Sequence, residues 1–296
     1  MTARLVCLGD RVWGVEMAYS IKGHALLKDN QSVDFIESPY VGGPLPKDMR
    51  ILVMHFTYGA SGRSSAEWFR SPDNPGSSAH VVVDRDGSVI QCVKFGTVAW
   101  HAGNSRWKNL VGLNKFAIGI EVANWGYLRP SGAGWSSHTG VSISNPVLAI
   151  HKNGNPNETA GPIGWEPYSE AQFEASAAIA RALISAYGID EIVGHDDISP
   201  GRKWDPGPAF DFDRFRTVVF GGDADEGDSR LVVAVAEGLN LRAGPGTGEP
   251  VIILLPAGTL VEPLARSGQW LNVSVIGEAG EPTYTGWVHG HYLATP

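Results

Sequence analysis

A histidine, a lysine and an aspartate stand close together in residues 193–208, a segment rich in glycine and proline. His195 offers an imidazole nitrogen and Asp205 a carboxylate, both common zinc ligands, and Lys203 lies just before Asp205. Such a segment cannot form a helix interior or a central strand, so we expect these residues in a loop of fixed path. The segment alone is equally consistent with an ordinary surface loop, because it contains no third ligand.

Two further residues with suitable chemistry lie in predicted strands. Residues 50–57 form a continuous apolar run with His55 near its end, as in a buried strand of an α/β sheet, where strand ends carry ligand-binding groups. Residues 116–122 predict a second buried strand, with Glu121 as its carboxylate. A lone glutamate in apolar surroundings either has a partner or has a raised pKa and a function. His55 taken alone could be a buried structural histidine.

Together these residues could form a zinc site of two histidines and one carboxylate. His55, His195 and Asp205 would leave a fourth position open, and a zinc ion of this kind binds water and lowers its pKa to near ~7. Glu121, on a neighbouring strand, could take the proton from that water. Lys203 could hold the oxyanion of a tetrahedral intermediate.

Motifs spread along residues 38–215 support the same site. They are Val53-Met54-His55-Phe56-Thr57, Ser78-Ala79-His80, Asp84-Arg85-Asp86-Gly87, Ala99-Trp100-His101-Ala102-Gly103, Asn114 with Ile118-Gly119-Ile120-Glu121, and Gly194-His195 through Pro208. In type and order they resemble the type-2 N-acetylmuramoyl-L-alanine amidase family, which is related to phage lysozyme-type amidases and peptidoglycan recognition proteins.

The resemblance implies one zinc ion per chain, with His55, His195 and Asp205 as ligands. It also implies a catalytic Glu121 and a Lys203 that stabilises the transition state. Substrate contacts are implied for three more residues of the motifs, His101, Trp100 and Asn114. His80 belongs to the family pattern as well, and we interpret it as structural or as a support for the ligands.

The last part of the chain has short strands, tight turns and no helical period, which predicts a small all-β barrel. It resembles a bacterial Src-homology-3-like domain in Gly238-Leu239-Asn240-Leu241-Arg242-Ala243-Gly244-Pro245-Gly246, Gly286-Trp287-Val288 and Tyr292-Leu293. Such domains commonly bind cell-wall peptides, and Trp270, Trp287 and Tyr292 could line a groove. Both tryptophans could equally be core residues. His289 and His291 lack a third ligand, and we expect them on the surface.

The chain is therefore expected to have four parts. Residues 1–37 are an N-terminal extension that could form a β-hairpin packed on the catalytic domain. Residues 38–220 are the α/β catalytic domain, a mixed central sheet flanked by helices. Residues 221–228 are an acidic, glycine-rich linker, and residues 229–296 are the SH3-like domain, expected to bind the cell wall.

Local patterns predict most of the elements within these parts. They indicate strands at 23–27 and 33–36, a hairpin turning at Asp86-Gly87, a helix opened by a capping box at 64–67, and helices over 169–187 and 210–220. Residues 126–167 are rich in Gly, Ser, Asn and Pro and are long for a loop in a compact domain, which indicates a functional rim or lid.

Composition excludes several classes of partner. The formal charge of −8 argues against binding of nucleic acid or of an anionic membrane. No stretch approaches the roughly 18 to 20 apolar residues of a membrane span.

Cys7 and Cys92 are no disulfide framework, and Cys92 is expected to be a buried hydrophobe. We find no convincing signal peptide and expect synthesis in the cytoplasm, followed by non-classical release to the cell wall in the periplasm or outside the cell.

The sequence thus predicts a zinc-dependent amidase that cuts peptidoglycan, its glycan-strand and stem-peptide partner, between N-acetylmuramic acid and L-alanine. It would be a lytic enzyme such as a phage-type lysin or a secreted effector, and an inhibitor or immunity protein could bind its cleft. One alternative is a recognition protein that holds peptidoglycan without cutting it. The other is a zinc peptidase that cuts within the stem peptide, which only the product would distinguish.

Overall fold

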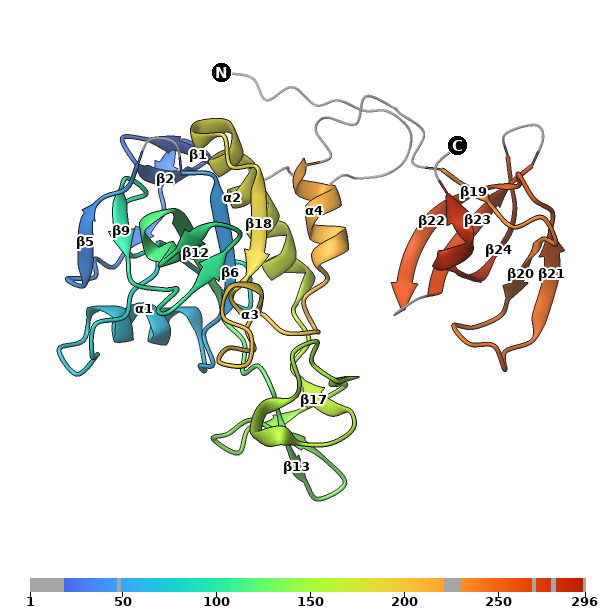
Figure 1. The fold of residues 1–296 in the computed structure, drawn as a ribbon, viewed down its shortest axis with the longest axis horizontal. Helices are drawn as coiled ribbons and strands as arrows, with labels where there is room; N and C mark the ends of the chain where they lie inside the picture. The colour runs from blue at the N-terminus through green and yellow to red at the C-terminus, as the bar shows by residue number, and fades with distance from the viewer. Residues whose placement is uncertain (1–18, 47–48, 221–229, 268–269, 278–280, 295–296) are drawn as a thin grey trace. The chain divides into compact units, whose positions relative to one another are not determined.

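The protein forms two compact units, Met1–Gly222 and Asp223–Pro296, each with a hydrophobic core of its own (Figure 1). The computed structural model describes residues 19–46, 49–220, 230–267, 270–277 and 281–294. The linker predicted over 221–228 and Cys7 lie outside the described residues.

A six-stranded mixed sheet forms the centre of the first unit. Its order is β18 (Glu191–Gly194), β6 (Ile51–Phe56), β12 (Ala117–Val122), β7 (Val81–Val83), β8 (Val89–Gln91) and β4 (Asp34–Phe35). Strand β6 pairs in parallel with both β18 and β12, while β7 and β8 form the antiparallel hairpin predicted at Asp86-Gly87. The central strands are buried and apolar, as strands covered on both faces must be. The predicted α/β class with a mixed sheet is confirmed.

Helices cover the sheet. Among the described residues of this unit the α-helices are α1 (Gly62–Arg70), α2 (Glu170–Tyr187), α3 (His195–Ile198) and α4 (Phe212–Phe220), with 3-10 turns η1 (Leu113–Lys115) and η2 (Pro156–Glu158). Helices α2 and α4 lie side by side (Figure 1). Nowhere in the described ranges is a helix long and apolar enough to cross a membrane.

Alternate residues of the central strands point to opposite faces of the sheet. Leu52 and Met54 of β6 face the core shared with α2 and α4. Ile51 and Val53 face the other side, where a second core cluster includes residues of α3 and of the loop before η1. Helix α1 covers β7 and β8 and buries Cys92 as predicted.

The helix caps were predicted with unequal success. Ser169 caps α2 as expected: its hydroxyl accepts the N–H of Gln172 at 3.1 Å, and Gly188 ends the helix in the left-handed region (φ 68°). The box predicted at 64–67 was wrong by one turn, because the N-cap of α1 is Ser61 and Ser64 closes the box as the third residue of the helix.

Short strands make up the rest of this unit. They are β1 (Tyr19–Lys22), β2 (Ala25–Lys28), β3 (Gln31–Ser32), β5 (Val41–Pro44), β9 (Thr97–Ala99), β10 (Arg106–Trp107), β11 (Leu110–Val111), β13 (Arg129–Ser131), β14 (Gly134–Ser136), β15 (Ser142–Ile143), β16 (Val147–Ala149) and β17 (Ile163–Trp165). Strands β1, β2 and β3 form one small antiparallel sheet. The strands expected at 23–27 and 33–36 have other bounds: β2 pairs with β3 across the turn at Asp29-Asn30, β1 pairs with β2 across Gly23-His24, and β4 pairs with β8.

Residues 126–167, hereafter the insertion, are not an irregular loop. They fold into a three-stranded sheet (β13, β14, β15) and a two-stranded sheet (β16, β17). The buried ring of His151 attaches the insertion to α3, since its Nε2 lies 2.9 Å from Asp196 Oδ2. Hydrogen bonds within these small sheets satisfy the backbone where the composition had indicated a loop.

The second unit is a seven-stranded antiparallel sheet, and the predicted SH3-like all-β class is confirmed. Its strands are β19 (Leu231–Val233), β20 (Leu239–Arg242), β21 (Val251–Leu255), β22 (Leu260–Ser267), β23 (Trp270–Ile276), β24 (Pro282–His289) and β25 (Leu293–Ala294), with the 3-10 turn η3 (Gly290–Tyr292). Trp270, His289 and Tyr292 line a cavity of about 420 Å³ that Trp287 does not line. His289, expected on the surface, is half-buried there. The side chain of His291 lies outside the described residues.

Candidate functional site

Neighbouring parallel strands bring the predicted reactive side chains together. His55 lies near the end of β6, Glu121 lies beside it in register on β12, and His195 follows β18 as the first residue of α3. Parallel strands end at the same edge of a sheet, so these side chains gather there. Asp205 comes from the loop after α3, and its carbonyl oxygen accepts the N–H of Asp196 at 2.8 Å, which fixes the loop on the helix.

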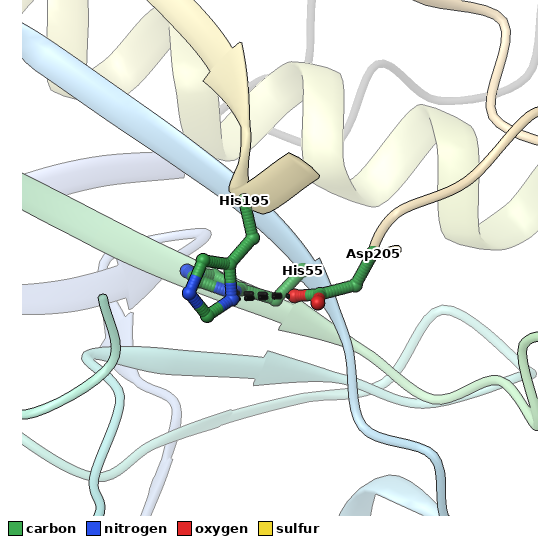
Figure 2. A group of neighbouring side chains, drawn as sticks. All are labelled: His55, His195 and Asp205. Atoms are coloured by element: carbon green, nitrogen blue, oxygen red, sulfur yellow. Dashed lines mark hydrogen bonds and ion pairs between the residues drawn. The ribbon is translucent and has the colours of Figure 1, made fainter. Parts of the chain in front are cut away.

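His55, His195 and Asp205 converge on one point (Figure 2). The Nδ1 atoms of the two histidines are 2.9 Å apart. Asp205 Oδ2 lies 2.9 Å from Nδ1 of His55 and 2.8 Å from Nδ1 of His195. All three residues are buried.

In each histidine of the triad, Nε2 is the outer nitrogen, which points away from Asp205, and Nδ1 is the inner nitrogen, which faces it. The hydrogen bond of the outer nitrogen determines whether the inner nitrogen carries a proton or a lone pair. His195 Nε2 lies 3.1 Å from the carbonyl oxygen of Ala102, which can only accept, so Nε2 carries the proton and Nδ1 a lone pair. By the same reasoning His101 Nε2 donates to the carbonyl of Ala117 at 3.4 Å. His101 Nδ1 then accepts from His55 Nε2 at 2.9 Å, which leaves a lone pair on His55 Nδ1 as well.

The three inner atoms are therefore all acceptors, held within hydrogen-bond distance of one another. A cation among them would satisfy all three, whereas without one the buried carboxylate oxygen faces two lone pairs. Two imidazoles and a carboxylate with a further position open are a ligand set that zinc accepts. The buried triad fits a metal site.

Electrostatics favours the protonation states that bind metal. Burial lowers the pKa of His55 to about 4, and the neighbouring His195 adds to this effect. Burial opposes ionisation of Asp205, and its pKa falls below the ordinary value when His195 or His55 carries a proton and donates it to the carboxylate. Neutral imidazoles and an ionised carboxylate are the forms that bind a metal ion.

Glu121 is set beside the triad without a partner for one oxygen. Its Oε2 atom is buried and makes no hydrogen bond to any described residue. Burial raises the pKa of its carboxyl group well above the ordinary value, and the charge of Asp205 adds to this, while Lys203 opposes it. A carboxyl group with a raised pKa at a cavity wall is suited to accept and return a proton.

A cavity of about 560 Å³ opens over these groups. The predicted residues that line it are Trp100, His101, Glu121, His195, Lys203 and Asp205. Asn114, expected to contact substrate, does not line it. Its Oδ1 instead accepts the backbone N–H groups of His101 and Ala102, at 3.0 and 2.6 Å.

Several aromatic side chains of the cavity were not predicted. They are Phe56, Tyr58, Trp68, Phe69, Tyr127 and Trp204. Trp68 could have been found, because the helical period that buries Ala66 and Phe69 directs it off the core face of α1, where it is 46% exposed. No sequence signal marks Tyr58, which has φ 54° and stacks on His138 of the insertion at 4.2 Å between ring centroids.

His80 occupies a structural position behind the triad. Its Nε2 donates to the carbonyl of Thr97 at 3.0 Å, and its Nδ1 accepts the N–H of Gly119 at 3.0 Å. Burial lowers the pKa of His80 to about 4, so the ring is neutral. Through these two hydrogen bonds His80 joins Gly119 of β12 to Thr97 of β9, the strand that precedes His101.

A buried triad of two histidines and an aspartate beside a glutamate, at the end of parallel strands, fits the metal site of a hydrolase. Residues 45–208, more than half of the chain, match the family model described as N-acetylmuramoyl-L-alanine amidase (Amidase_2). The chain belongs to this family, and the predicted resemblance is confirmed. Residues 237–294 match the model of the bacterial SH3 domain.

Similar proteins cover only part of the chain. The 1,6-anhydro-N-acetylmuramyl-L-alanine amidase AmpD of Escherichia coli is 35% identical over 144 residues, which are 48% of this chain and 58% of AmpD. The E. coli amidase AmiD is 32% identical over 124 residues, 41% of this chain and 34% of AmiD. A solved complex of AmiD with anhydro-N-acetylmuramic acid-L-Ala-D-gamma-Glu-L-Lys gives 25% identity, a TM-score of 0.44, and coverage of 68% and 65%. The chain spans less than two thirds of the length of these curated relatives.

Proposed function

We propose that this protein is a zinc-dependent amidase that hydrolyses the amide between the lactyl group of N-acetylmuramic acid and the L-alanine of the peptidoglycan stem peptide. The observation that carries the proposal is the convergence of two imidazole lone pairs and a carboxylate beside the unpartnered oxygen of Glu121. Family membership supports the reaction type. A peptidoglycan substrate implies action at the cell wall, in the periplasm or outside the cell.

His55, His195 and Asp205 would hold one zinc ion per chain. When bound, zinc supplies a Lewis acid that polarises a carbonyl group and lowers the pKa of water. The rigid contacts behind both histidines keep the ligand atoms in place before the metal arrives, which reduces the cost of ordering them.

Glu121 carries out the proton transfers of the reaction. Its Oε2 takes a proton from the attacking water as the water oxygen bonds to the lactyl carbonyl carbon. Negative charge develops on the carbonyl oxygen, to which Lys203 on the cavity wall donates a hydrogen bond. When the C–N bond breaks, Glu121 returns the proton to the leaving nitrogen, and the products are a lactyl carboxylic acid and a free L-alanine amine.

The walls of the cavity suit the two halves of such a substrate. Trp68 and Trp100 are 46% and 37% exposed, and their indole faces can pack on the apolar faces of sugar rings. Arg202 lines the same cavity and can pair with a carboxylate of the stem peptide. Pairing of this kind would orient the scissile amide over the triad.

Two alternatives make different products. A recognition protein without activity is disfavoured, because the three ligand positions and Glu121 all carry competent groups. A zinc peptidase would use the same metal chemistry but would cut within the stem peptide.

Digestion of purified peptidoglycan tests the proposal, with mass spectrometry of the products in the presence and absence of a zinc chelator. Intact stem peptides with a free L-alanine amine, lost on chelation, are expected. Shortened peptides still attached to sugar would establish the peptidase. Binding of peptidoglycan without products, by protein shown to contain zinc, would establish the recognition protein.

A matched variant separates metal binding from proton transfer. We expect Glu121→Gln to keep the zinc affinity of the wild type, because Glu121 is not a ligand, and to lose about 100-fold or more in kcat, because an amide cannot accept the proton. Zinc titration and steady-state kinetics on a soluble muramyl peptide measure both. Wild-type kcat in this variant would exclude Glu121 as the base.

A further inference from the structure

One short stretch of backbone lies behind both histidines of the triad. The side chain of His101 accepts the outer proton of His55, and the carbonyl oxygen of the next residue, Ala102, accepts the outer proton of His195. Two consecutive residues thus determine which tautomer each ligand adopts. If this stretch moved, both histidines would lose the acceptor that determines their tautomer.

The stretch has little freedom of its own. Gly119 of β12 leaves room for the imidazole ring, because a Cβ atom there would lie 2.5 Å from Cγ of His101. Arg202 Nη2 donates to the carbonyl oxygen of Ala102 at 3.0 Å, on the side of the loop that carries Asp205. These contacts fix the ring of His101 and the carbonyl of Ala102, but not the backbone N–H groups of the two residues.

Asn114 of η1 holds those amides. Its Oδ1 accepts the N–H of His101 at 3.0 Å and the N–H of Ala102 at 2.6 Å. One side-chain oxygen therefore fixes both residues that orient the histidines. Asn114 is outside the cavity, so it acts on the site through this backbone and not through substrate.

We propose that Asn114 is a positioning residue for metal binding: its side-chain oxygen holds residues 101 and 102 so that His55 and His195 both present Nδ1 to the ion. The inference rests on the proposed zinc site. Partners of this kind behind metal-ligating histidines typically change metal affinity by about 10- to 100-fold when they are removed. The acceptor oxygen is the essential feature, and the amide nitrogen of Asn114 is not.

Three variants test this role. Asn114→Leu has a similar volume but no acceptor, Asn114→Ala removes the acceptor without adding bulk, and Asn114→Asp keeps an acceptor oxygen. The control is Asn74→Leu, because Oδ1 of Asn74 likewise accepts two backbone N–H groups, those of Gly76 and Ser77.

The measurement is the zinc dissociation constant, by competition with a chromophoric chelator, with circular dichroism of the metal-free proteins to establish folding. We expect weakening by about 10- to 100-fold in the Leu and Ala variants, and affinities within about threefold of the wild type in Asn114→Asp and Asn74→Leu. Wild-type affinity in a folded Leu or Ala variant would overturn the inference, as would equal weakening in Asn74→Leu. Failure of the wild-type protein to bind zinc would instead overturn the proposed metal site.

Discussion

Lys203 reaches the cavity from the loop that carries Asp205, and its charge acts on both His55 and Glu121. Because the ammonium group would meet charge that develops only in the transition state, we expect Lys203→Met to lower kcat by about 100- to 1,000-fold with KM within about threefold. Lys203→Arg keeps the charge, and its kcat should fall by less than that of Lys203→Met. Steady-state kinetics on a soluble muramyl peptide measures both variants. A change in KM alone would assign Lys203 to substrate binding.

His80 should make the stability of the first unit depend on pH. Burial lowers its pKa to about 4 from an ordinary 6.5, so the unfolded chain binds a proton first as the pH falls. The resulting stabilisation is complete above pH 6.5 and is lost toward pH 4, on the order of 3 kcal/mol for a full shift. His80→Gln can keep both hydrogen bonds without titrating. Urea unfolding of the metal-free proteins should therefore give a smaller decline between pH 6.5 and 4 in the variant, and parallel declines would contradict this.

At the scale of single residues, the types of the metal ligands could be predicted from the sequence, but the atoms that they present could not. The order of the motifs in the sequence is enough to predict His55, His195 and Asp205 as ligands. That both histidines present Nδ1 depends on the carbonyl oxygens of Ala102 and Ala117, which any residue could supply, so no side chain in the sequence signals it. The prediction that Asn114 contacts substrate has the same limit, because a motif gives the type and position of a residue but not the atoms that it contacts.

At the scale of elements, the buried pair of His151 and Asp196 joins the insertion to α3. His151→Ala would leave Asp196 Oδ2 without its partner, and we expect the free energy of unfolding of the first unit to fall by about 3 kcal/mol. Lys152 also pairs with Asp196 but is 46% exposed at its side chain, so Lys152→Ala is the matched control, with an expected loss of no more than about 1 kcal/mol. Urea unfolding monitored by tryptophan fluorescence measures both. Equal losses of unfolding free energy in the two variants would show that the buried His151 contributes no more to stability than the exposed Lys152.

Elements with strong local signals were predicted, and those fixed by contacts distant in sequence were not. Helix α2 has its cap, its apolar face and its terminal glycine within one continuous stretch. Helix α1 begins earlier than expected because Ser61 caps it, and its first residue, Gly62, packs on Asp84, where a Cβ atom would lie 2.9 Å from the aspartate Cβ. The insertion resembled a loop because its strands are two or three residues long and gain stability from contacts such as that of His151.

At the scale of the whole molecule, the proposed metal ligands all belong to the first unit, while the second has its own core built on residues such as Leu241, Val261 and Val273. A ligand stabilises only the folded structure that binds it, by about 4 kcal/mol at a free concentration 1,000 times its Kd. Differential scanning calorimetry should therefore show two transitions, of which zinc raises one and leaves the other in place.

The variant His195→Ala provides the control for this last prediction, because it removes a ligand from the first unit and changes nothing in the second. Its zinc-dependent transition should lose the shift, while the second transition keeps the wild-type temperature. A chelator added to the wild-type protein should have the same effect as the substitution. If zinc raised both transitions together, or if one transition moved as a whole, the two units would unfold cooperatively, and the SH3-like unit would then report on the state of the metal site.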